Sequence, residues 1–69
     1  MDIRTMQERH VTDREIDRHL EDLVGANGKG VLGLVRERAE YCATLGGPHF
    51  VANSLRLAGA AAKKMKEVV

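Results

Sequence analysis

The sequence predicts an all-α fold that forms one small domain over residues 1–69. Apolar residues recur at intervals of three and four along most of the chain, as in amphipathic helices. Glycine and proline gather in two short stretches that interrupt this pattern. We expect three helices, at about residues 13–24, 30–45 and 48–67, that follow a flexible N-terminal arm at residues 1–10. An alternative for the arm is a helical segment with Ile3, Met6 and His10 on one face.

The first expected helix has the clearest start. Thr12 and Glu15 have the spacing of a capping box, in which each side chain bonds the backbone N–H of the other residue. Val11 and Ile16 stand at the two positions of a hydrophobic staple. An apolar stripe follows from Ile16, and the remaining face is charged, with Arg14, Asp17, Arg18, Glu21 and Asp22.

Between the first two helices, the stretch VGANGKGVLGLV contains Gly28, Gly30 and Gly33 in the order G-x-G-x-x-G. A dinucleotide site of this pattern needs a preceding strand, whereas a helical pattern precedes it here. The phosphate-loop pattern also fails, because no Gly-Lys pair is followed by Ser or Thr. We therefore expect these glycines to end one helix and begin the next, without binding a nucleotide.

The second expected helix places Leu32, Val35, Ala39 and Cys42 on one face. Gly46 and Gly47 suit its end, and Pro48 suits the first position of a third helix, where its missing N–H is not needed. In that third helix, apolar residues alternate at steps of four and three as far as Val69, which is a heptad pattern.

Such a helix is longer than the short helices of one chain can cover, and 69 residues make a marginal core, so a homodimeric helical bundle is the predicted assembly. The alternative is a last helix that packs only on its own chain. The expected dimer interface consists of Val51, Leu55, Ala58, Gly59, Ala62 and Met65.

Composition excludes several function classes. The chain has one cysteine, and its three histidines do not form a paired metal-ligand spacing, so we expect neither a disulfide within the chain nor a metal or other cofactor. Cys42 falls on an apolar stripe and the carboxylates on exposed faces, so we expect no catalytic residue and no enzymatic activity. No apolar run is long enough for a membrane span or a signal peptide, which predicts a cytoplasmic protein.

Two kinds of partner remain. A helix-turn-helix DNA-binding regulator is one alternative, because the last helix carries Arg56, Lys63, Lys64 and Lys66. The net charge is only +1, however, and the start of that helix is apolar, so we regard nucleic acid as the less favoured partner. A structural subunit is a further alternative. The favoured interpretation is a protein-binding module that contacts its target through Ile3, Arg4, Met6, Arg9, Arg14, Asp17, Arg18 and Glu21.

In its small size, its composition rich in Arg, Ala, Gly and Leu, and its lack of catalytic groups, the chain resembles the small helical proteins with which bacteriophages inhibit host regulators. These include anti-activators that sequester transcription factors. The resemblance is one of general character and involves no motif. It implies a protein that binds and inhibits a protein target, with a transcription regulator as the implied target.

Overall fold

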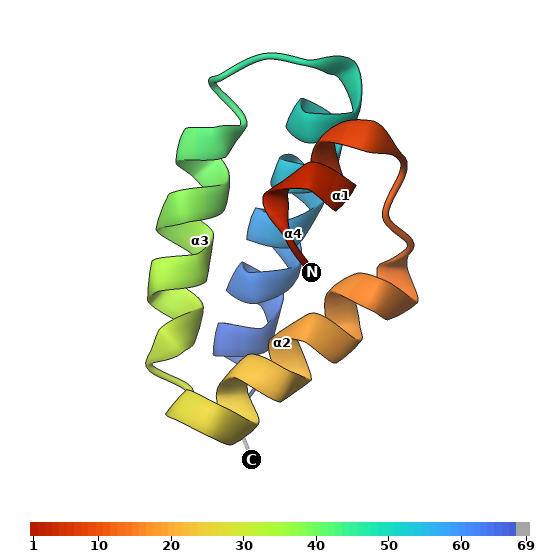
Figure 1. Cartoon of the computed structure of the whole chain (residues 1–69). Helices are drawn as coiled ribbons and strands as arrows, with labels where there is room; N and C mark the ends of the chain where they lie inside the picture. The colour runs from red at the N-terminus through yellow and green to blue at the C-terminus, as the bar shows by residue number, and fades with distance from the viewer. Residues whose placement is uncertain (68–69) are drawn as a thin grey trace.

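The computed structural model describes residues 1–67, which fold into four helices and contain no strand. The helices are α1 (Ile3–Glu8), α2 (Asp13–Asn27), α3 (Val31–Cys42) and α4 (Pro48–Lys66). Helices α3 and α4 lie side by side and run in opposite directions (Figure 1). Helix α4 contacts the other three helices and is the centre of the fold. The all-α prediction is confirmed, but the expected number of three helices is wrong.

The helix missing from the prediction is α1, which occupies most of the expected flexible arm. The Asp2 carboxylate caps it by accepting a hydrogen bond of 2.8 Å from the Thr5 N–H, and this bond lowers the pKa of Asp2. Met6 is buried against the core. Six residues are too few to show a helical period, and such a short helix depends on its contact with α4.

Asn53 of α4 holds the linker between α1 and α2 in place. Its side-chain oxygen accepts a bond of 3.0 Å from the Val11 N–H, and its side-chain nitrogen donates to the Met6 and Arg9 carbonyls at 2.9 and 2.8 Å. Arg56, one turn further along α4, donates to the Val11 carbonyl and to the Asp13 carboxylate. The N-terminal segment is thus bonded to the middle of α4, 40 or more positions away in the sequence.

The predicted capping box of α2 is confirmed. Thr12 Oγ1 accepts a bond of 3.2 Å from the Glu15 N–H, and the Glu15 carboxylate accepts one of 3.1 Å from the Thr12 N–H. Arg9 donates two further bonds to the same carboxylate, at 2.6 and 2.9 Å. These contacts, with that from Arg9 the largest, lower the pKa of Glu15 from 4.5 to about 2.

Helix boundaries differ from the prediction by up to three residues. Helix α2 continues to Asn27. Gly28 caps its C-terminus, with a φ of +82° that lies in the region that favours glycine. Helix α3 ends at Cys42, because Thr44 and Leu45 donate to carbonyls three residues back and so tighten the chain. Pro48 begins α4 as predicted.

The face of α4 that its own chain covers differs from the heptad face predicted to form the dimer interface. Leu55 and Met65 are 57% and 38% exposed, and of the six residues expected at the dimer interface only Ala58 is buried. The other helices cover an adjacent face of α4, and this face includes the polar residues Asn53 and Ser54. Val69, expected to extend the heptad pattern, lies outside the described residues. The buried residues of α4 are Phe50, Asn53, Ser54, Leu57, Ala58 and Ala61.

Candidate protein-binding surfaces

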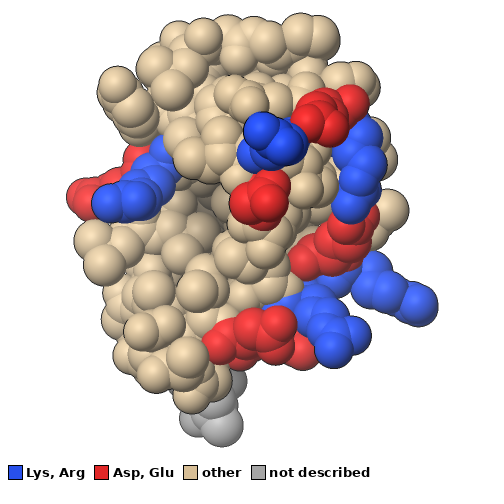
Figure 2. All heavy atoms as spheres, in the orientation of Figure 1, with Lys and Arg blue, Asp and Glu red and all other residues tan. Residues whose placement is uncertain are grey.

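A groove between α1 and α3 is a concave feature with a predominantly apolar lining. Its outer part has a volume of about 450 Å³, and its inner part, between Met6 and Leu57, has about 220 Å³. Ile3, Arg38, Cys42 and Phe50 line both parts, so the two are continuous. Figure 2 shows a hollow on this face with a mainly uncharged lining. We call this feature the α1–α3 groove.

Large apolar side chains form the rim of the α1–α3 groove. Ile3, Tyr41 and Leu45 are 60%, 65% and 57% exposed, although each has a largely apolar side chain. Arg38 is the only Lys, Arg, Asp or Glu in the lining, and within residues 1–67 it forms no ion pair. An exposed apolar patch with a single charge at its edge is typical of a site that binds a partner.

Next to the groove, α2 presents a mixed-charge surface. Arg14, Asp17, Arg18, Glu21 and Asp22 line a shallow depression along it, and we call these five residues the α2 charged surface. Figure 2 shows acidic and basic side chains interspersed on this side of the molecule.

His19 connects the α2 charged surface to the groove. It lines the inner groove and also a second depression that includes Arg18 and Asp22. Burial lowers the pKa of His19, which favours its neutral form at pH 7. The groove and the α2 charged surface are therefore adjoining parts of one area.

The structure brings together some of the residues expected to bind a partner and separates others. Arg14, Asp17, Arg18 and Glu21 share the α2 charged surface, while Ile3 and Met6 line the groove. Arg9 is bonded to Glu15, and Arg4 lies 3.8 Å from Glu8 within α1, so these two cations already have partners. Sequence reasoning missed the contribution of α3, namely Arg38, Tyr41 and Leu45. The spacing of Tyr41 and Leu45, one turn apart and outside the core stripe, was the available signal.

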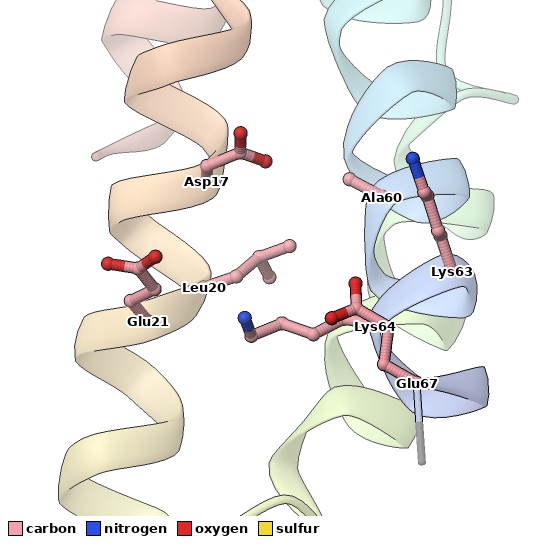
Figure 3. Close-up of a pocket in the computed structure, with 7 residues that line it drawn as sticks. All are labelled: Asp17, Leu20, Glu21, Ala60, Lys63, Lys64 and Glu67. Atoms are coloured by element: carbon pink, nitrogen blue, oxygen red, sulfur yellow. The ribbon is translucent and has the colours of Figure 1, made fainter. Parts of the chain in front are cut away.

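A polar crevice of about 270 Å³ lies between α2 and α4. In Figure 3, Leu20 points from α2 toward α4, and the Lys64 side chain extends toward α2. The two lysines of this crevice share it with Asp17, Glu21 and Glu67. Arg56 is bonded to Asp13 and the Val11 carbonyl. Much of the positive charge expected to favour DNA thus lies close to carboxylates, which reduces its field at a phosphate backbone.

The predicted heptad residues leave an unpartnered apolar stripe on α4. Leu55, Gly59 and Met65 are exposed, and Val51 and Ala62 are half-buried. A Cβ added at Gly59 would meet no side chain and no other part of the described chain within 4 Å, apart from the adjoining backbone of its own helix. We call these five residues the α4 stripe.

No protein-family model, curated protein or solved structure matches this chain. In residues 1–67, no three His, Cys, Asp or Glu side chains are grouped so as to hold a metal ion. No helix of the described chain combines the length and the apolar character needed to cross a membrane.

Proposed function

We propose that this chain is a non-enzymatic protein that binds and inhibits a protein target. The observation that carries the proposal is the area formed by the α1–α3 groove and the α2 charged surface, which meet at His19. Exposed Ile3, Tyr41 and Leu45 supply apolar contact area in this region. Protein interfaces combine such an apolar centre with a polar rim.

The α2 charged surface gives this interface its selectivity. Arg14 and Arg18 alternate with acidic residues along one exposed helix face. Complementary charges on a target accelerate encounter, and like charges on a wrong partner repel it. The α1–α3 groove then contributes most of the apolar area that is buried in the interface with the target.

The α4 stripe supports the second part of the proposal, which is a homodimer. A continuous apolar face with heptad spacing is complementary to a second copy of itself, and small residues such as Gly59 and Ala62 allow two helices to approach closely. A dimer through this stripe would leave the groove and the α2 charged surface available, because the stripe shares no residue with them.

The target we propose to test first is a cytoplasmic transcription regulator. This choice follows from the resemblance in size and composition to phage inhibitors of host regulators. Inhibition would then arise because the bound protein covers a surface that the regulator needs.

Affinity capture from the native cell with nuclease treatment tests this proposal. The wild-type chain and an Arg14→Glu/Arg18→Glu variant are compared, with Arg36→Glu on the exposed side of α3 as the matched control. We expect one partner that survives nuclease, that is lost with the double variant and that is retained with the control. Titration of the purified partner with wild-type protein should then reduce the partner's activity. Recovery of nucleic acid alone, lost at raised salt, would contradict the proposal and support DNA binding.

A further inference from the structure

We propose that the α1–α3 groove binds an amphipathic helix of the target, and that this helix carries an acidic residue opposite Arg38. This inference rests on the proposed function and specifies the chemistry of the partner. It follows from the groove's walls, its dimensions and its single charged residue, Arg38.

The walls of the groove favour a helix over an extended peptide. Both walls are helices, and residues 1–67 contain no sheet edge to which a peptide strand could be added. The groove lining is mainly apolar, with Gln7, His19, Arg38 and the Tyr41 hydroxyl as its main polar groups. An extended peptide would find no backbone partner on the groove's apolar walls, whereas a helix pairs its own N–H and C=O groups.

The dimensions of the groove match one helix face. On α3 the groove lining extends from Val35 to Cys42, a stretch about 12 Å long, which corresponds to about two turns of a bound helix. The inner cavity of about 220 Å³ is larger than an apolar cavity of about 150 Å³ that accommodates benzene. One large apolar side chain of the partner fits this inner cavity, and others one turn away contact Tyr41 and Leu45.

Arg38 determines the charge of the partner helix. It lines both parts of the groove and has no ion-pair partner in the portion of the chain that the structure describes. The neighbouring Arg36 and Glu40 pair with each other at 3.7 Å, so Glu40 does not serve as the partner of Arg38. A bound helix would partly remove Arg38 from water, and a carboxylate on that helix would compensate for the lost hydration.

Selection from a displayed library of random 16-residue peptides on the full-length chain tests this inference. The wild type is compared with Leu45→Glu and Arg38→Glu in the groove, and with Leu34→Glu as the matched control. Leu34 is 61% exposed on α3 and does not line the groove. We expect the wild type and the control to enrich peptides with apolar residues at helical spacing and one acidic residue. Leu45→Glu should abolish this enrichment, and Arg38→Glu should enrich basic peptides instead.

A synthetic peptide of the most enriched sequence then measures the charge contact. Arg38→Glu should weaken its binding about tenfold or more, and exchange of the peptide's acidic residue for Lys should restore binding to that variant. Because these side chains are exposed, the variants should keep the helix content of the wild type, which circular dichroism checks.

Three results would overturn the inference. The first is enrichment of peptides without helical spacing, or no enrichment at all. The second is enrichment that Leu45→Glu leaves unchanged. The third is a wild-type dimer that Leu45→Glu dissociates and Leu55→Glu does not, which would make a second copy the occupant of the groove. If target capture remains sensitive to Arg14→Glu/Arg18→Glu in any of these cases, the proposed function stands and only the helix-binding groove is rejected.

Discussion

Replacement of Asn53 with Ala tests whether one buried side chain holds the N-terminal segment on α4. Besides a bond of 3.3 Å that Asn53 Oδ1 accepts from Arg56 within α4, the substitution removes the three hydrogen bonds to the N-terminal segment, from the Val11 N–H and to the Met6 and Arg9 carbonyls, at 2.8 to 3.0 Å. At about 1 kcal/mol each, these bonds predict a loss of about 3 kcal/mol in the free energy of unfolding. The loss is a large fraction of a small domain's stability, which starts at about 5 kcal/mol.

Urea unfolding followed by circular dichroism measures this loss. Hydrogen exchange of the Val11 amide measures the local effect, because this N–H is bonded only to Asn53. Asn27→Ala is the control, since the Asn27 side chain donates one exposed bond to the Leu23 carbonyl. We expect the control to lose less than about 1 kcal/mol. A similar small loss for Asn53→Ala, with unchanged exchange at Val11, would refute the reasoning.

Three further predictions concern α2 and the α4 stripe. The pKa of Glu15 is lowered from 4.5 to about 2, so its stabilising effect is present above pH 4.5 and is lost as the pH falls toward 2; Glu15→Gln should therefore reduce the loss of stability over this interval in acid titrations of unfolding. Gly59→Ala and Gly25→Ala should each stabilise the chain by up to about 1 kcal/mol, because both glycines are helical and have open space around them. Only Gly59→Ala should weaken dimerisation in sedimentation experiments, and equal effects of the two would argue against close contact at the α4 stripe. Leu55→Asp should yield a helical monomer because Leu55 is exposed, whereas Leu57→Asp should reduce helix content because Leu57 is buried. A wild-type chain that sediments as a monomer would contradict the proposed dimer.

Local signals in the sequence predicted most of the fold. The Thr12–Glu15 capping box, the core stripe through Ile16 and Leu20, and the start of α4 at Pro48 are all present in the structure. Each depends on residues within one or two turns of one another, which is the range over which helical periodicity carries information.

The sequence did not predict features that depend on contacts between distant segments. Helix α1 is too short to show a period, and the polar Asn53, which tethers it, interrupts the apolar pattern of its own helix. Helix α4 has two adjacent apolar faces, and periodicity alone does not decide which of them its own chain covers. The groove was missed for the same reason, since it exists only where α1 and α3 both lie against α4.

Chemical-shift mapping of side-chain methyl and aromatic groups, with and without the captured target, tests most directly whether the target occupies the α1–α3 groove. We predict that the signals of Ile3, Tyr41 and Leu45 shift on binding, because these exposed side chains form the groove's rim. The signals of Leu34 and Leu55, which are exposed outside the groove, should keep their positions. Shifts confined to Leu34 or Leu55, with Ile3, Tyr41 and Leu45 unchanged, would contradict the account.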